Sequence, residues 1–301
     1  MSARAITFVG WNVENLAPHL SLPAAASTRA SRARAARSAP LSLADIAARL
    51  GNPDVLCLQE ARLRDGDTAA IAAARAALAD HECQLSLCSD RENVSFRGGR
   101  AYGVVSYVRR ALQPCWLARA PWDLEGRLAL CELPAQNLVI GNVYAVNGTG
   151  KPYFDHELGA LHGDRHAFKR RFQERLMHAL AELRAAGREL VLLGDWNVSR
   201  SALDTFPRLR TEPPHALARK LFNESFVPAL DLVDVFRELH PGAREYTWFN
   251  RRAPPGALDA ARVDFILVSR SLLPRVRSAS IEADLSLRFR SDHAPVRLVL
   301  E

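Results

Sequence analysis

Residues 190–197 read Leu-Val-Leu-Leu-Gly-Asp-Trp-Asn. A short aliphatic run is typical of a buried β-strand, and here it places Asp195 and Asn197 directly after the strand. A polar cluster beside an apolar run occurs at four other places in the chain. They are Trp11-Asn12-Val13-Glu14-Asn15, Leu58-Gln59-Glu60, Asn142-Val143-Tyr144-Ala145-Val146-Asn147 and Ser291-Asp292-His293-Ala294-Pro295. Residues that close strands project from one edge of a sheet, so we expect these clusters to meet in a single cleft.

Short β-rich runs alternate with helical stretches throughout the chain, which is the pattern of an α/β protein. The expected strands are Ala5–Val9, Val55–Leu58, Gly103–Val108, Leu128–Leu133, Leu138–Val143, Leu190–Leu193, Val263–Val268 and Val296–Leu300. The expected helices are Leu43–Leu50, Thr68–Ala79, His166–Ala186 and His215–Asn223. In the third helix, an apolar residue recurs at the spacing of one helix face, at Phe168, Phe172, Leu176 and Leu180.

Length and charge set limits on the kind of protein. The chain has 301 residues, a hydrophobic fraction of 48% and a net charge of +7. This length suits one large α/β domain or two smaller ones. Nearly all of the positive charge comes from arginine, whose guanidinium matches phosphate geometry, and this favours a polyanionic partner. The alternative is the codon bias of a GC-rich genome, which would also explain the abundant alanine.

The cysteines and the N-terminus point to a reducing cytoplasm. Five cysteines at irregular spacing form neither a zinc pattern nor a disulfide framework. The N-terminal apolar run is too short and too polar for a signal peptide, and no run approaches the length of a membrane span.

One segment near residues 17–40 departs in composition from the rest. It is rich in alanine and serine, lacks acidic residues between positions 17 and 39, and carries Arg29, Arg32, Arg34 and Arg37. We interpret it as a basic, low-complexity insertion. It is either a mobile loop that meets a phosphate backbone or a solvated, disordered insertion without a specific role.

The side chains of the five clusters indicate the kind of metal that they could bind. Carboxylates are frequent, histidine is rare and thiolates are missing from these clusters. Oxygen donors of this kind favour a hard cation, Mg²⁺ or Mn²⁺. Because magnesium keeps several waters and takes only one or two carboxylates, Glu60 is the expected direct ligand. Asn12, Glu14 and Asp292 are expected close by or acting through water.

In this order, the five clusters resemble those of the exonuclease III and abasic-site endonuclease family, within the endonuclease/exonuclease/phosphatase superfamily. The resemblance covers residues 6–301 apart from the basic insertion. It implies a single α/β domain, residues 1–301, in which two packed β-sheets are flanked by helices in a four-layer, deoxyribonuclease-I-like sandwich. Glu14 departs mildly from the family, which commonly has aspartate at this position.

The resemblance also implies catalytic roles. Asp195 would position or deprotonate the attacking water, and Asn197 would hold that water or the phosphate. Asp264, in Ala261-Arg262-Val263-Asp264, would pair with His293 and favour its charged form beside the phosphate. Tyr144 would contact the scissile phosphate or the leaving group.

Three residues are expected to bind nucleic acid. By resemblance, Arg127 in Glu125-Gly126-Arg127 would grip backbone phosphate, and Asn147 would lie at the same edge as Tyr144. Trp248 would stack on a sugar or base, with a place in the core as the alternative. The chain has Ala261 where many abasic endonucleases have a tryptophan pocket wall, and Gly150 near the position of an intercalating arginine. Chemistry is therefore better indicated than abasic-site selectivity.

The resemblance implies a Mg²⁺-dependent DNA repair nuclease, cytoplasmic and nucleoid-associated. It would hydrolyse phosphodiester bonds of damaged double-stranded DNA at abasic sites, damaged 3′ ends or both. An alternative is another phosphodiesterase or phosphatase of the superfamily, acting on RNA, phospholipid or inositol phosphate. The lack of a histidine just after Val143 argues against the last two substrates. A catalytically silent nucleic-acid-binding module predicts gaps among the acidic residues, and these clusters have none.

Overall fold

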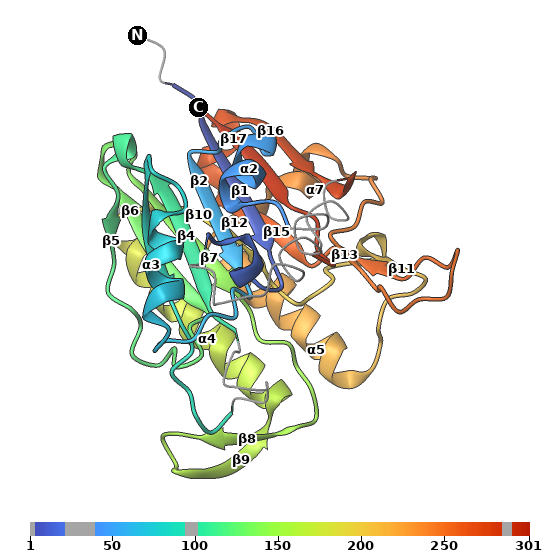
Figure 1. Ribbon diagram of the computed structural model, residues 1–301. Coiled ribbons are helices and arrows are strands. Elements are labelled where there is room, and N and C mark those ends of the chain that lie inside the picture. The colour runs from blue at the N-terminus through green and yellow to red at the C-terminus, as the bar shows by residue number, and fades with distance from the viewer. Residues whose placement is uncertain (1–3, 22–39, 94–101, 285–290) are drawn as a thin grey trace.

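The computed structural model describes residues 4–21, 40–93, 102–284 and 291–301. Within them, two six-stranded mixed sheets pack against each other (Figure 1). The first sheet has the order β16 (Val276–Ile281), β17 (Val296–Leu300), β1 (Ile6–Asn12), β2 (Val55–Gln59), β4 (Val104–Arg109), β3 (His81–Ser86). The second has the order β12 (Leu232–Asp234), β15 (Asp264–Ser269), β10 (Glu189–Asp195), β7 (Leu138–Tyr144), β6 (Leu128–Leu133), β5 (Cys115–Trp116).

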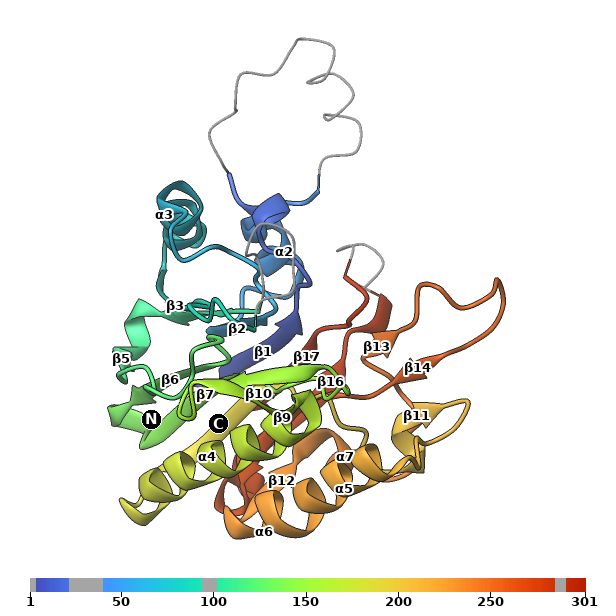
Figure 2. The same ribbon diagram turned by 90° about the horizontal axis from the view of Figure 1, so that it is seen from below.

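Helices cover the outer faces of both sheets and complete four layers (Figures 1 and 2). Two of them, α2 (Leu43–Arg49) and α3 (Thr68–Ala76), lie on the first sheet. The second sheet is covered by α4 (Arg165–Ala185) and α5 (Pro213–Leu221), with a π-helical turn (Phe222–Phe226) and α6 (Val227–Ala229) continuing the chain. A short helix, α7 (Val235–Leu239), packs into the core between the sheets. The expected four-layer α/β sandwich is confirmed.

The strand sequences explain why the sheets are buried on both sides. In β10, all residues after Glu189 are buried, because one face meets the other sheet and the opposite face meets α4. Leu193 packs between the sheets, whereas Leu192 packs toward the helix layer. Such strands appear as continuous aliphatic runs rather than as alternating patterns. The eight expected strands are all present, with boundaries that shift by up to three residues.

The structure adds strands that the sequence did not indicate. β3 and β16 lie at the edges of the first sheet and are half polar, so their apolar signal is weak. Two small sheets are also present: β8 (Pro152–Asp155) with β9 (Ala160–Asp164), and β11 (Thr205–Phe206) with β14 (Ala260–Ala261) and β13 (Trp248–Phe249). The strands of the second small sheet have two residues each, which leaves no period to detect.

The helices follow from their apolar spacing and their caps. In α4, the predicted residues Phe168, Phe172, Leu176 and Leu180 are all buried. The side chain of Asp164 caps this helix by accepting a hydrogen bond from the backbone N–H of Ala167. α3 ends at Ala76, earlier than expected. No helix among the described residues is long and apolar enough to cross a bilayer. Residues 22–39, most of the basic insertion, lie outside the described part of the chain.

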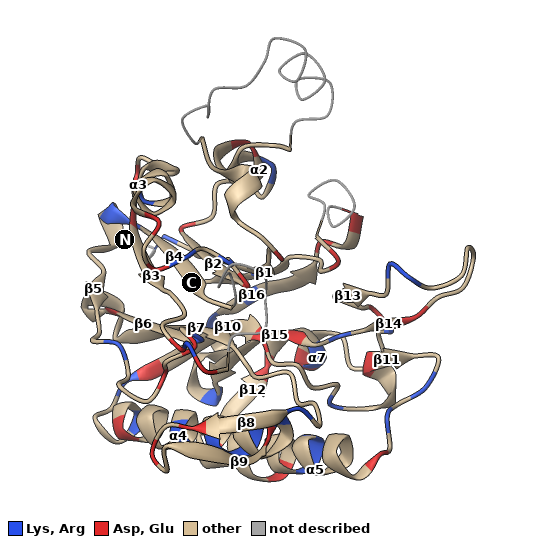
Figure 3. Cartoon of the chain, turned by 60° about the horizontal axis from the view of Figure 1, so that its bottom comes forward, with Lys and Arg blue, Asp and Glu red and all other residues tan. Residues whose placement is uncertain are grey.

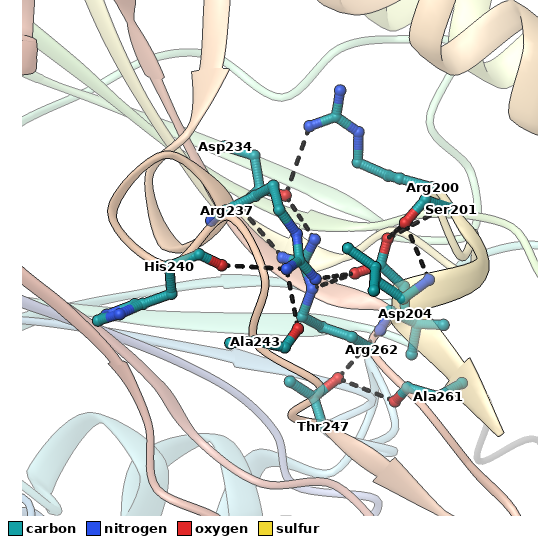
Figure 4. Close-up of polar contacts among 12 residues, drawn as sticks. Arg200, Ser201, Asp204, Asp234, Arg237, His240, Ala243, Thr247, Ala261 and Arg262 are labelled. Carbon is teal, nitrogen blue, oxygen red and sulfur yellow. Dashed lines mark hydrogen bonds and ion pairs between the residues drawn. The ribbon is translucent and has the colours of Figure 1, made fainter.

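A buried ionic network ties the small sheet β11–β14–β13 to the second sheet (Figure 4). Arg262 donates to Asp204 at 2.7 Å and forms a bidentate pair with Asp234 at 3.1 and 2.8 Å. Arg237 also donates to Asp204 at 2.7 Å. Only 1% of the Arg262 surface is exposed. This network fixes the strand that leads into Asp264.

Replacing Arg262 by methionine should therefore destabilise the protein strongly. The substitution leaves the carboxylates of Asp204 and Asp234 with less compensation in a buried position, which costs about 3–5 kcal/mol. The free energy of unfolding in urea measures this loss. Arg270→Met is the matched control, because its ion pair with Asp231 is largely exposed, and it should cost less than about 1 kcal/mol. Similar losses in the two variants would contradict the role given to the network.

Candidate active site

The polar clusters meet at one end of the sandwich, where strands of both sheets finish. Asn12 closes β1, Glu60 follows β2, and Tyr144 and Asp195 close the parallel strands β7 and β10. These ends border a cleft of about 1170 Å³, also lined by Asn147, Asn197, Trp248, Asp292 and His293. Figure 3 shows acidic segments near the ends of β10 and β15 and basic segments in the loops beside β11 and β14. The expected convergence is confirmed.

Asn12 links the carboxylates of the two sheets. Its Nδ2 donates to Glu60 at 3.1 Å and to Asp195 at 2.9 Å. Its Oδ1 accepts the backbone N–H of Glu14 at 2.9 Å. The side chain is fully buried, and both ends of its amide have partners. The geometry therefore lets Asn12 orient the carboxylates, and its expected place beside a metal stays a prediction.

His293 and Asp264 form a buried pair at the start of β15. Nδ1 of His293 lies 2.8 Å from Oδ2 of Asp264. Burial alone would lower the pKa of His293, but the carboxylates of Asp264 and Asp195 raise it to about 10. The imidazole is thus positively charged at neutral pH, and Nε2 is the atom left to donate into the cleft. This agrees with the pairing expected from the sequence.

Asp195 has the properties of a general base. Burial and the nearby carboxylate of Asp264 raise its pKa to about 7, although His293 and Asn12 oppose the rise. A carboxylate with a pKa near the working pH can both accept and release a proton. The backbone N–H of Asn197 donates to Asp195 at 2.9 Å, and Asn197 adopts a left-handed backbone conformation with φ of 51°. This turn places both side chains at the cleft.

Glu60, Glu14 and Asp292 form the acidic side of the site. Glu60 accepts hydrogen bonds from Asn12 and, at 2.9 Å, from the hydroxyl of Tyr144, and it also pairs with Arg62. Burial and the Asp292 carboxylate raise the pKa of Glu14, so negative charges are crowded there. Crowded oxygen donors of this kind fit a hard divalent cation, which would relieve their repulsion.

A second set of possible ligand atoms is less suited to a metal. Atoms of Asp195, Asp264 and His293 lie within 4.8 Å of one another. However, Nδ1 of His293 is engaged by Asp264, and a protonated imidazole repels a cation. These three residues are therefore less suited to hold a cation than the carboxylates around Glu60.

The structure places Arg127 at the wall of the cleft with its charge already paired inside the protein, and its expected phosphate contact stays a prediction. Its side chain is 1% exposed and pairs with Glu125, while Nη1 donates to the backbone oxygen of Tyr144 at 3.0 Å. The guanidinium also lies over the ring of Tyr102, 4.0 Å from its centre. Glu125 pairs in addition with Arg165, 40 residues away. Arg127 therefore supports the end of β7 from within.

Trp248 and Asn147 lie at the cleft as expected. Asn147 is exposed there. Trp248 is half-buried, and its Nε1 donates to Oδ2 of Asp292 at 3.1 Å. Its backbone pairs in register with Ala261. The indole therefore stands beside the small alanine and supplies an aromatic wall of the cleft.

The sequence matches the family model of the Endonuclease/Exonuclease/phosphatase family over residues 9–293. The chain belongs to this family. It is 26% identical over 255 residues to an exodeoxyribonuclease from Bacillus subtilis (strain 168), a match that covers 82% of this chain and 88% of that one.

Solved structures of the family share the fold. An AP endonuclease from Leishmania major, LMAP, matches with a TM-score of 0.71 and 19% identity, over 99% of this chain and 88% of that one. A variant of the 3′ phosphatase NExo from Neisseria, bound to a product DNA hairpin, matches with a TM-score of 0.66 and 23% identity, over 98% and 99% of the two chains.

The cleft contains cations that sequence reasoning missed. Arg208 and Arg210 are exposed along its rim, between β11 and α5, and Arg219 and Arg252 also line it. They form no motif, and the arginine-rich composition was the one available signal. Because they line the same cleft as Arg127, they are further candidate phosphate contacts.

Lys169 was also missed, since it lies on the largely apolar face of α4. It is buried, lines the cleft, and donates from Nζ to the backbone oxygen of Asn197 at 2.6 Å. Burial lowers its pKa from 10.5 to about 8, although Asp195 opposes the change. The lysine therefore fixes the turn that carries Asn197 and places a positive charge near the base.

The buried charge of Lys169 predicts a specific pH dependence of stability. From about pH 8 to 10.5 the unfolded chain binds more protons at this residue than the folded chain, so the wild type becomes more stable as pH rises. Lys169→Met lacks this effect. The difference in the free energy of unfolding, variant minus wild type, should thus be largest near neutral pH and smaller at about pH 10. Urea unfolding at the two pH values measures this difference. For Lys220→Met, at an exposed lysine, the difference from wild type should be the same at every pH in this range. A difference that is likewise independent of pH for Lys169→Met would disprove the lowered pKa of Lys169.

Proposed function

We propose that this protein is a metal-dependent nuclease that hydrolyses phosphodiester bonds of damaged double-stranded DNA, at abasic sites, blocked 3′ ends or both. The observation that carries the proposal is the buried pair of Asp264 and protonated His293 beside Asp195, in a cleft rimmed by arginines. This combination presents a base and an anion-stabilising group to one phosphate. The names of the relatives, an exodeoxyribonuclease, an AP endonuclease and a 3′ phosphatase, support the same chemistry and substrate.

The proposed cofactor is Mg²⁺, with Mn²⁺ as the alternative. Glu60, Glu14 and Asp292 would hold it, since their carboxylates crowd the acidic side of the site. When bound, such a cation neutralises charge on phosphate oxygens and orients the substrate. The hydrogen bonds of Glu60 to Asn12 and Tyr144 fix the position of its carboxylate in advance.

The protein's own groups act on the attacking water, on the non-bridging oxygens and on the leaving oxygen. As the water oxygen bonds to phosphorus, the bond from phosphorus to the leaving oxygen breaks, and this oxygen accepts a hydrogen bond from Tyr144 and takes its proton from solvent. Asp195 accepts a proton from the attacking water, which Asn197 orients. Protonated His293 donates from Nε2 to a non-bridging phosphate oxygen, where negative charge develops. Burial and Glu60 hold the pKa of Tyr144 well above its usual range, so this hydroxyl acts as a donor rather than as a base. Each proton therefore has a defined place before the substrate arrives.

The cleft favours a polymeric substrate over a small phosphate ester. Exposed Arg208 and Arg210 extend the positive charge beyond the reacting groups. A longer polyanion can contact both regions at once. RNA, phospholipid and inositol phosphate are the alternative substrates of the superfamily, and the last two are small or lack an extended polyanionic backbone. Trp248 lies beside Ala261, the position where many abasic endonucleases have a tryptophan pocket wall. Trp248 therefore supplies an aromatic surface near the site although Ala261 is small.

Single substitutions test the assigned chemistry. Asp195→Asn and His293→Ala should each reduce the single-turnover rate by roughly 10²–10⁴-fold or more, because each removes a proton-transfer or charge-stabilising group. Labelled duplexes that are intact, carry an abasic analogue, a 3′-phosphate nick or a recessed 3′ end, assayed with Mg²⁺ and with chelator, measure this loss and the preferred lesion. Asp231→Asn, at an exposed acid, is the control. Rates near wild type in either site variant would remove that residue from the mechanism.

The salt dependence of DNA binding tests the phosphate contacts proposed for Arg208 and Arg210. Arg208→Ala and Arg210→Ala should each weaken duplex binding about equally across sequences and reduce the slope of log affinity against log salt by about one unit. Arg277→Ala, at an exposed arginine of β16, should leave the slope unchanged. If neither rim substitution alters the slope, these arginines lie outside the DNA path.

A further inference from the structure

Lysine is rare in this chain, and two of its three lysines line the cleft. Of the 40 basic residues, Lys151, Lys169 and Lys220 are the ones that carry an amine instead of a guanidinium. Lys151 and Lys169 border the cleft, whereas Lys220 lies on α5 with 66% of its side chain exposed. A guanidinium stays protonated in a protein, but an amine can lose its proton and act as a nucleophile. The two amines therefore offer a chemistry that the arginines around them cannot perform.

Lys169 has the surroundings of a nucleophilic amine, and Lys151 has not. Lys169 is 8% exposed, while Lys151 is exposed at the start of the β8–β9 hairpin. Burial and the positive charges of Arg127 and Arg210 lower the pKa of Lys169 to about 8, although Asp195 opposes the change. Enzymes activate lysine for attack on carbonyl groups in the same way, by desolvation and nearby cations.

The amine is held at the reacting groups. Nζ of Lys169 donates to the backbone oxygen of Asn197 at 2.6 Å. The backbone N–H of Asn197 in turn donates to the carboxylate of Asp195 at 2.9 Å. A neutral amine keeps a hydrogen for the bond to Asn197 and has a lone pair free to attack a carbon atom. One turn of the chain therefore places a nucleophile and a proton acceptor at the same cleft.

The chemistry of the amine identifies the substrate that it can attack. A primary amine condenses with an aldehyde to form an imine. The sugar of an abasic site opens to an aldehyde at C1′, whereas the sugar of an intact nucleotide is closed by its base. The inference therefore rests on the proposed function, which brings an abasic sugar to this cleft.

We propose that Lys169 forms an imine with the ring-opened abasic sugar and gives the protein a second activity, elimination of the phosphate 3′ to that sugar. Nζ bonds to C1′, and the carbonyl oxygen leaves as water. Asp195 then accepts a proton from C2′, a double bond forms between C2′ and C3′, and the C3′–O bond breaks with its electron pair on the phosphate oxygen. Water hydrolyses the imine and returns the amine. The sequence of steps consumes no oxidant and no metal ion.

The test uses the full-length protein in chelator, which prevents metal-dependent hydrolysis, and two duplexes that differ in the lesion. One carries a natural abasic site, and the other carries its tetrahydrofuran analogue, which lacks the aldehyde. With cyanoborohydride, which reduces an imine to a stable amine, wild type should become cross-linked to the first duplex and not to the second. Without the reductant, the first duplex should be cut 3′ to the sugar and carry an unsaturated aldehyde end instead of a 3′-hydroxyl.

The position of the adduct and two matched variants identify the amine. Mass spectrometry of cross-linked wild type should place the adduct on Lys169. Lys169→Arg keeps the positive charge but cannot form an imine, so it should lose both the cross-link and the 3′ cut. Cooperative urea unfolding establishes that this variant is folded. Lys151→Arg, at the other lysine of the cleft, should keep both signals.

Several results would overturn the second activity. One is an adduct on Lys151, Lys220 or the N-terminal amine, and this result decides the matter even if Lys169→Arg does not fold. Another is a folded Lys169→Arg variant that cross-links like wild type. If wild type cuts the tetrahydrofuran duplex with Mg²⁺ but cross-links to neither duplex, the elimination fails while the proposed function stands. Cross-linking at Lys169 without Mg²⁺-dependent cutting would support the elimination and remove the hydrolysis.

Discussion

The hydrogen bonds of the Asn12 side chain are the interaction on which the rest of the site depends. Its amide donates to Glu60, which follows a strand of the first sheet, and to Asp195, which ends a strand of the second. The two carboxylates would otherwise repel each other across the boundary between the sheets. A single neutral donor, fully buried at the end of β1, therefore sets the spacing between Glu60 and Asp195.

The charges of the site can be held only because the scaffold is rigid. Asp195 and Asp264 are both buried beside His293. Burial and the repulsion from Asp264 raise the pKa of Asp195, while both carboxylates raise the pKa of His293. Such an arrangement opposes folding unless surrounding packing and ion pairs fix it. The Arg262 network on one side and the Arg127–Glu125–Arg165 cluster on the other lie directly behind the reacting groups. Their arginines are held in ion pairs inside the protein.

The cleft has two kinds of lining, exposed arginines and an aromatic side chain. Arg208 and Arg210 offer charge, which any phosphate backbone satisfies regardless of sequence or damage. Trp248 offers an aromatic surface at the same cleft. The charged and the aromatic parts of the cleft therefore reside on different segments of the chain.

The sequence alone determined the parts of the protein that depend on local pattern. Aliphatic runs placed the central strands, the spacing of Phe168, Phe172 and Leu176 placed α4, and polar clusters at strand ends predicted one cleft. Tertiary structure decided the rest, because burial and charge pairing depend on residues far apart in the chain. Arg127 looked available for phosphate, yet it is paired within a cluster that includes Arg165. Lys169 is part of the predicted helix, but the sequence did not indicate that its side chain donates a hydrogen bond to Asn197, 28 residues further on. A side chain's neighbours are set only when the sheets pack.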